Sequence, residues 1–236
     1  MPPAGGWRRS EFRDGVITIA PLELAGAPFG LIFGAAAVAA GLSPWEATFM
    51  SATVFAGSAQ FLAIGLWSTA SWLGLAFAVL LVNLRYVLMA ASIVRKMERF
   101  RPWQRGLAAF VLADETWAMA ERRALSRPLT PAFYAGLGLT TYVSWVLATA
   151  AGAIAGTLLP QPERFGLDFA FPAVVICLVL GFAKSWRAAP VVAASALAAL
   201  VTHQVVEGTW FVVAGGLAGM VAAVLLPAPA KTDDER

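Results

Sequence analysis

Long apolar runs, separated by short charged or proline-rich connectors, constrain this chain more than any other feature of its sequence. A helix of about 20 apolar residues crosses the hydrocarbon core of a bilayer. Only 13% of the residues are charged, against about 25% in a soluble domain, so a water-facing surface could not be covered. The apolar segments cover roughly residues 15–40, 43–67, 72–94, 106–120, 131–158, 167–184, 188–203 and 207–226.

The segments are continuous rather than alternating with period two, which favours helices over a β-barrel. We therefore predict an all-α, polytopic transmembrane helical bundle with seven or eight membrane segments, at least one of them broken or re-entrant. One transmembrane domain is expected over residues 1–226. The remaining residues, 227–236, are polar and are expected to form a disordered tail.

Composition argues against several other functions. The net charge is +3, but Lys and Arg stand in short clusters between apolar runs, as flanking charges do in membrane proteins. The expected surroundings are a lipid bilayer, and no nucleic acid partner is expected. The single cysteine, Cys177, and single histidine, His203, are too few for an internal disulfide or a structural metal site. We expect no cofactor, and without a nucleophile elbow, a Walker loop or a His cluster we expect no enzyme.

Two membrane topologies are open. If all eight segments span and the N-terminus is cytoplasmic, ten Lys and Arg residues lie inside and six outside, and loop 95–105 violates the positive-inside rule. If segment 106–120 is re-entrant and one of the first three segments is broken or non-spanning, loops 95–105 and 121–130 both become cytoplasmic. The division of charges is then fifteen to one.

Glycines four residues apart indicate close helix packing, either within the chain or at a dimer face. They form the sets Gly26/Gly30/Gly34, Gly152/Gly156 and Gly215/Gly219.

The first segment is unusual because Pro21, Pro28 and Gly30 stand within ten residues, around Glu23. Proline removes a backbone donor, and transporters use broken helices as binding sites whose half-helix N-termini attract carboxylates. We predict a break between Ala20 and Gly30, and we assign these residues to a substrate site. The alternative is a simple proline kink.

Polar groups in the second and third segments extend this candidate site. Ser58 and Gln60 lie among small residues, where Gln60 could bind a substrate or join helices by hydrogen bonds. Asn83 and Arg85 lie within the third segment, and Arg85 is about 13 Å from its end at 1.5 Å per residue. A charge near the membrane midplane needs a partner, so Arg85 could bind a carboxylate or form a structural ion pair.

The fourth segment carries Asp114 and Glu115, which point about 100° apart on a helix. We predict that Arg85 lies within about 4 Å of one of them, beside the break in the first segment, with Glu23 as a rival partner. Glu115 could face a cavity or the ammonium of a substrate. If this segment is interfacial, both acids could instead be solvated.

Two further polar residues stand at segment ends. His203 is interpreted as a boundary residue rather than a proton relay. Glu46 follows Ser43-Pro44 and is interpreted as a helix-start carboxylate near a cap.

These elements together resemble the AzlC family over roughly residues 12–180. No element is specific alone, but their order is. The resemblance is carried by Phe12-Arg13-Asp14-Gly15, Pro21, Pro28-Phe29-Gly30, Phe55-Ala56-Gly57-Ser58-Ala59-Gln60-Phe61, Asn83-Leu84-Arg85, Ala113-Asp114-Glu115-Thr116 and Gly166-Leu167-Asp168-Phe169-Ala170.

The resemblance implies a bacterial inner-membrane permease that exports branched-chain amino acids such as valine, leucine and isoleucine, with a small membrane subunit of the AzlD family. A polar interior within an apolar bundle suits a zwitterion, with Arg85 near the carboxylate and Asp114 or Glu115 near the ammonium. Two alternatives stay open: a channel or carrier for another small solute, and a non-transporting membrane scaffold.

Overall fold

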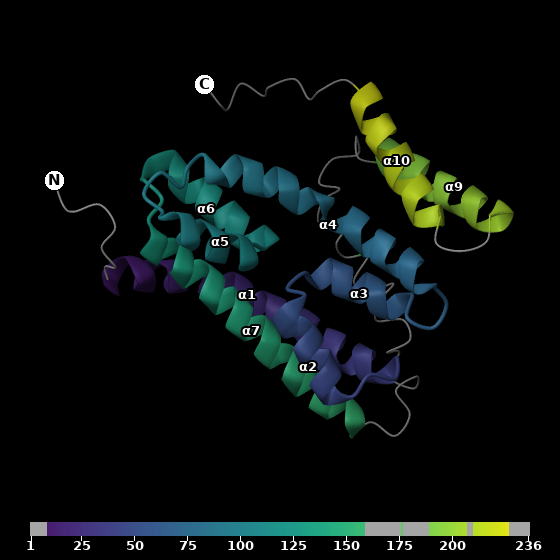
Figure 1. Ribbon diagram of the computed structural model, residues 1–236, viewed down its shortest axis with the longest axis horizontal. Coiled ribbons are helices and arrows are strands. Elements are labelled where there is room, and N and C mark those ends of the chain that lie inside the picture. Colours follow the sequence, from purple (N-terminus) through teal and green to yellow (C-terminus); the bar gives the residue numbers. More distant parts are fainter. Residues whose placement is uncertain (1–8, 159–175, 177–188, 207–209, 227–236) are drawn as a thin grey trace. The chain divides into compact units, whose positions relative to one another are not determined.

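The computed structural model describes residues 9–158, 176, 189–206 and 210–226, and these residues form helices and no strands (Figure 1). This confirms the all-α prediction. The helices are α1 (Arg9–Ala39), α2 (Pro44–Thr53), α3 (Gly57–Gly65), α4 (Trp72–Val94), α5 (Pro102–Phe110), α6 (Asp114–Ser126), α7 (Pro131–Thr157), α9 (Ala189–Val205) and α10 (Trp210–Leu225). Most of segment 167–184 and the tail 227–236 lie outside the described residues.

Three of these helices are long and apolar enough to cross a membrane: α1, α4 and α7. The helices α9 and α10 are apolar but shorter, with 17 and 16 residues. The number of seven or eight membrane segments therefore stays a prediction.

The chain forms two compact units, which we describe separately. Unit 1 contains α1, α2, α3, α4 from Val82 onward, α5, α6 and α7. Unit 2 contains α4 up to Leu81 together with α9 and α10.

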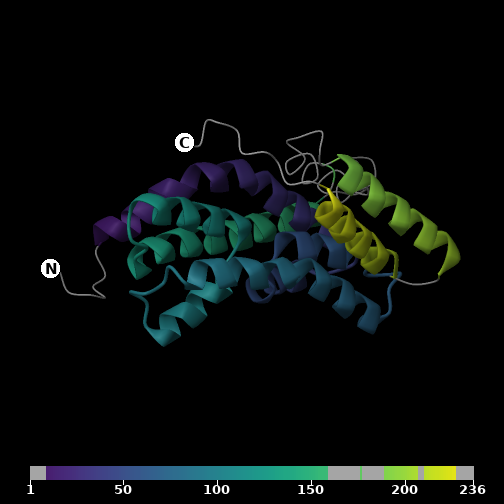
Figure 2. The ribbon, with the colours of Figure 1, turned by 90° about the horizontal axis from the view of Figure 1, so that it is seen from above.

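The helix α1 runs without interruption through Pro21 and Pro28, and Figure 2 shows it as one continuous, arched helix. The predicted break between Ala20 and Gly30 is therefore wrong. Both prolines are exposed, whereas Gly30 is buried against Ala148 of α7. Because α7 supports the opposite face of α1, the helix tolerates the hydrogen bonds that the prolines remove.

The helices α1 and α7 lie side by side and run parallel (Figure 1). Gly15 packs against Gly136 near the start of both helices, and Gly34 packs against Gly152 near their ends. A Cβ at Gly34 would collide with the carbonyl oxygen of Thr149, so glycine lets the two backbones approach. The glycine prediction fails at Gly26, where a Cβ would meet nothing within 4 Å.

The second predicted segment is broken, although the first is not. The helix α2 ends at Thr53 and α3 begins at Gly57. Leu42, just before α2, and Ile64, near the end of α3, belong to the same apolar cluster as Phe33 of α1. The chain therefore enters and leaves this helical hairpin at the end of unit 1 where α1 ends.

The fourth predicted segment is a second hairpin, wider than the expected range of 106–120. The helix α5 ends at Phe110 and α6 begins at Asp114. Phe100, before α5, and Ala120, within α6, share an apolar cluster with Phe133 of α7. This hairpin therefore opens at the end of unit 1 where α1 and α7 begin, opposite to the first hairpin.

The two hairpins begin in the same way. Proline occupies the first turn of α2 and α5, where its missing N–H is not needed. Glu46 accepts a hydrogen bond from the Ser43 backbone N–H (2.7 Å), and Gln104 accepts one from the Arg101 N–H (2.8 Å). This confirms Glu46 as a capping carboxylate, and the Ser43 hydroxyl and N–H hydrogen bonds lower the pKa of Glu46.

The two hairpins also resemble each other in the sequences at their starts and at their breaks. Pro44-Trp45-Glu46 and Pro102-Trp103-Gln104 start the hairpins, and Val54-Phe55-Ala56 and Val111-Leu112-Ala113 form their breaks. The two hairpins thus share these short sequence features and enter unit 1 from opposite ends.

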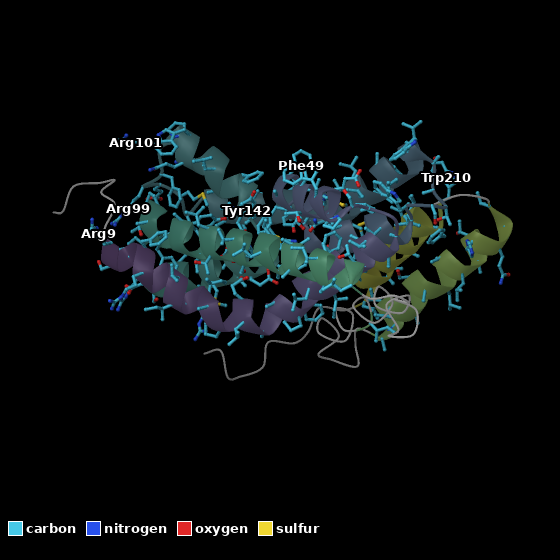
Figure 3. The ribbon with its side chains drawn as sticks, turned by 90° about the horizontal axis from the view of Figure 1, so that it is seen from below. Arg9, Phe49, Arg99, Arg101, Tyr142 and Trp210 are labelled. Carbon is cyan, nitrogen blue, oxygen red and sulfur yellow. The ribbon has the colours of Figure 1, made fainter. Side chains whose placement is uncertain are left out.

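Ion pairs fix which connections share an end of unit 1. Arg123 of α6 pairs with Glu11 of α1 at 2.7 Å, and Lys96 after α4 pairs with Glu121 of α6. Figure 3 shows Arg9, Arg99 and Arg101 at this same end. The N-terminus of α1 and loops 95–105 and 121–130 therefore lie together, as the fifteen-to-one topology requires.

In unit 2, α9 and α10 pack through small residues. A Cβ at Gly215 would lie 3.1 Å from the Ser195 carbonyl oxygen, and one at Gly219 would lie 3.4 Å from the Ser195 Cβ. His203 contacts Phe211 edge to face, with ring centroids 5.2 Å apart. In this structure His203 therefore packs against an aromatic ring near the end of α9.

Candidate functional site

Arg85 lies where the breaks of the two hairpins meet. Its Nη2 atom is 3.0 Å from Asp114 Oδ2, at the start of α6, and donates to Ser58 Oγ at 2.7 Å, in the first turn of α3. The predicted pairing of Arg85 with the fourth segment is confirmed, and Asp114 is the partner. The two side chains are 30% and 34% exposed, so the pair is partly accessible within unit 1.

The local sequence positions Asp114 for this contact. Thr116 Oγ1 accepts a hydrogen bond from the Ala113 N–H at 2.7 Å and so closes the first turn of α6. Asp114 is the first residue of that helix, where the macrodipole favours a carboxylate. Asp114 therefore neutralises Arg85 from a defined helix start.

Aromatic rings line the same junction. The Tyr86 ring centroid lies 5.1 Å from Arg85 Cζ, within the range of a cation–π contact. The Tyr142 ring of α7 contacts Phe55 in the first break (5.3 Å between centroids) and Phe110 just before the second (5.7 Å). Figure 3 shows Tyr142 between the two ends of α7. One residue of α7 thus contacts both breaks.

Glu115 is exposed beside the ion pair. Its carboxylate interacts electrostatically with those of Asp114 and Glu23 and with the Arg85 guanidinium, and it forms no ion pair among the described residues. Because Asp114 already neutralises Arg85, Glu115 is the carboxylate of this group that is open to a positively charged ligand.

Glu23 is not the partner of Arg85. It accepts hydrogen bonds from two hydroxyls of α7, Thr141 Oγ1 at 2.7 Å and Ser144 Oγ. No Lys or Arg among the described residues forms an ion pair with it. Glu23 is thus a carboxylate within a candidate membrane span, held by neutral donors.

Gln60 belongs to a buried network that joins helices. Its amide donates to Ser51 Oγ at 3.0 Å and accepts from Trp145 Nε1 at 2.9 Å, and Ser51 shares a hydrogen bond with Thr149. The Gln60 side chain is fully buried. These contacts favour the interpretation of Gln60 as a link between α2, α3 and α7 rather than as a substrate ligand.

The remaining predicted residues take no part in the ion pair. Pro21 and Pro28 are exposed on α1, and Gly30 contacts Ala148. Asn83 Oδ1 is inaccessible and has no hydrogen-bond partner among the described residues. The structure thus brings together Ser58, Arg85, Asp114, Glu115 and Glu23, and it gives Gly30 a packing role.

Sequence reasoning missed Tyr142, Thr141 and Ser144. The signal was present, because the run Thr140-Thr141-Tyr142-Val143-Ser144 places hydroxyl groups in the middle of an otherwise apolar segment. Such groups are expensive in lipid unless they have partners, which makes them candidates for an interior face.

The group as a whole contains more acid than base. Glu23, Asp114 and Glu115 stand against Arg85 alone among the groups that interact here. Ionised carboxylates only accept hydrogen bonds, whereas guanidinium only donates. The arrangement can therefore hold an ammonium group near Glu115 and a carboxylate near Arg85.

The chain is similar in sequence to proteins that are described as membrane proteins. A protein from Archaeoglobus fulgidus, described as an uncharacterized membrane protein, is 31% identical over 210 residues, which cover 88% of this chain and 92% of that protein. The inner membrane protein YgaZ of Escherichia coli is 29% identical over 185 residues, which cover 75% of each chain. No solved structure matches the chain significantly.

The family follows from a match to the sequence pattern that its members share. The sequence pattern described as AzlC protein matches residues 21–159, which include all three candidate spans in whole or in large part and both hairpins. The chain is therefore a membrane protein of the AzlC family.

Proposed function

We propose that this protein is a permease that exports branched-chain amino acids, namely valine, leucine and isoleucine, across the bacterial inner membrane. The observation that carries the proposal is the Arg85–Asp114 ion pair where the two breaks meet, with Glu115 exposed beside it. Charges within membrane segments are costly and mark substrate pathways, so a scaffold would gain nothing from this arrangement. The proposal involves no covalent chemistry and hence no enzyme activity.

The chemistry of the site suits an amino acid zwitterion. The substrate carboxylate would approach the Arg85 guanidinium and the N-terminus of α3. This helix begins at Gly57, and no side chain of its N-cap residue accepts a hydrogen bond from its first backbone N–H groups. The ammonium would approach Glu115. Tyr142, Phe55 and Phe110 supply apolar surface near both groups, which suits an aliphatic side chain.

A small membrane subunit of the AzlD family is the proposed partner. The exposed apolar residues of the candidate spans include Leu24 and Leu147, at 80% and 63% exposure. In the membrane, lipid or such a subunit would cover these faces.

The experiment is export of radiolabelled leucine and valine from vesicles that contain the protein alone or with an AzlD-family subunit. We expect saturable export that unlabelled isoleucine inhibits and lysine does not. Export of unrelated small solutes without competition would indicate a channel or a carrier for another solute. If no solute moved even with both subunits present, the protein would be a non-transporting scaffold.

A further inference from the structure

Glu23 is an acidic residue within a candidate span, and its hydrogen-bonding environment fits two protonation states. Each of its hydroxyl partners has a second acceptor within reach. Thr141 Oγ1 lies 3.1 Å from the Leu137 carbonyl oxygen, and Ser144 Oγ lies 3.1 Å from the Thr141 carbonyl oxygen.

These alternatives matter because a hydroxyl has one proton to donate and two lone pairs to accept with. When Glu23 is a carboxylate, both hydroxyls can donate to it. When Glu23 is protonated, one hydroxyl can turn to its own helix carbonyl and accept the new O–H. Both states are then fully hydrogen-bonded, so protonation leaves no buried polar group unpaired.

The charged groups around Glu23 are two carboxylates at the start of α6 and the guanidinium of Arg85 on α4. Glu115 is close enough to Glu23 for their charges to interact, and Glu115 interacts in the same way with Asp114 and Arg85, which pair with each other. The helix α7 offers the two hydroxyls, and α3 carries no charged residue. Glu46 is at the start of α2, and the Glu11–Arg123 pair is near the opposite end of unit 1.

On this basis we propose that Glu23 carries the coupled proton and that the protein exchanges a proton for each exported amino acid. This inference rests on the proposed function. One proton converts the carboxylate to the neutral acid on one side of the membrane and leaves on the other.

Electrostatics explains why the proton and the amino acid would exchange. An ammonium group at Glu115 adds positive charge near Glu23 and favours its ionised form. Protonated Glu23 in turn removes a negative charge that would attract the ammonium. Because this coupling is reciprocal, the proton and the substrate weaken each other's binding, as an exchanger requires.

The test uses the full chain with its partner subunit in proteoliposomes and compares two assays. The first is exchange of labelled for unlabelled leucine at equal pH, and the second is net leucine movement driven by a pH gradient. We expect wild-type protein to perform both. Glu23→Gln, which imitates the protonated acid, should lose the response to the gradient. Its exchange of leucine for leucine should continue at saturating leucine but with a raised KM, because the negative charge that attracts the ammonium is gone.

Two further variants make the outcome decisive. Glu46→Gln changes a carboxylate at the start of α2 and should keep both activities. Thr141→Val with Ser144→Ala removes the hydroxyl donors but keeps Glu23, so the pH profile of gradient-driven transport should change. An unchanged gradient response in Glu23→Gln, or an unchanged pH profile in the double variant, would overturn the inference.

The same assays separate this inference from the proposed function. Wild-type exchange of leucine that no pH gradient affects would leave the permease in place and remove Glu23 as a proton carrier. Wild-type protein that exchanges no branched-chain amino acid at all would refute the proposed function itself.

Discussion

Arg85 and Asp114 form an ion pair of 3.0 Å that joins α4 to the break of the second hairpin. The same Arg85 nitrogen reaches Ser58 in the first hairpin at 2.7 Å. Two hairpins that enter from opposite ends of unit 1 therefore share one cation. Neither break contains a basic residue of its own, so a change at Arg85 on α4 removes the cation from both breaks.

The first prediction concerns this cation. We expect Arg85→Ala to abolish leucine and valine export while the protein still reaches the membrane. Breaking one partner of a buried pair costs about 3–5 kcal/mol, and partial exposure of this pair reduces that figure. Export is measured per molecule of membrane-inserted protein. Lys96→Gln, which removes the ion pair with Glu121 outside the site, is the matched control and should keep export. Normal export by Arg85→Ala would remove Arg85 from the substrate site.

The second prediction separates Gln60 from that site. Gln60→Leu leaves the Trp145 N–H without its acceptor, while Ser51 keeps Thr149 as a partner; an unsatisfied buried group costs about 1–3 kcal/mol. We expect a lower melting temperature in detergent and less protein in the membrane, but unchanged export per folded molecule. Full stability combined with lost export would instead make Gln60 a substrate ligand.

The sequence predicted an ion pair of Arg85 with Asp114 or Glu115 because few charges lie in the apolar segments and each needs a partner, and the structure shows Asp114 as the partner. The sequence did not predict which helix would break. The sequence of α1 contains two prolines and yet is continuous, since α7 supports it. The breaks occur at Val54–Ala56 and Val111–Ala113, which contain no proline and depend on tertiary packing around Tyr142. Local propensity cannot show such packing.

The third prediction tests the packing of α1 on α7. We expect Gly34→Val to prevent stable folding, because a Cβ at this position would collide with the Thr149 carbonyl oxygen. Gly26→Ala is the control, since a Cβ there meets nothing within 4 Å and alanine favours a helix by about 0.5–1 kcal/mol over glycine. The yield of monodisperse protein in detergent reports both. Equal loss of yield in the two variants would contradict the assigned interface.

The last prediction concerns topology. Because ion pairs and the opening of the second hairpin place loops 95–105 and 121–130 with the N-terminus of α1, the positive-inside rule assigns all three to the cytoplasm. We replace Cys177, the only cysteine, by serine and introduce single cysteines at exposed positions. Glu98→Cys and Ser126→Cys should react with an impermeant maleimide only when the cytoplasmic face is accessible, as in inverted vesicles. Thr157→Cys, at the end of α7, should react in intact cells. If Glu98→Cys and Ser126→Cys labelled from opposite sides, α5 and α6 would cross the membrane as one span, and the two breaks could not meet at Arg85 from opposite ends.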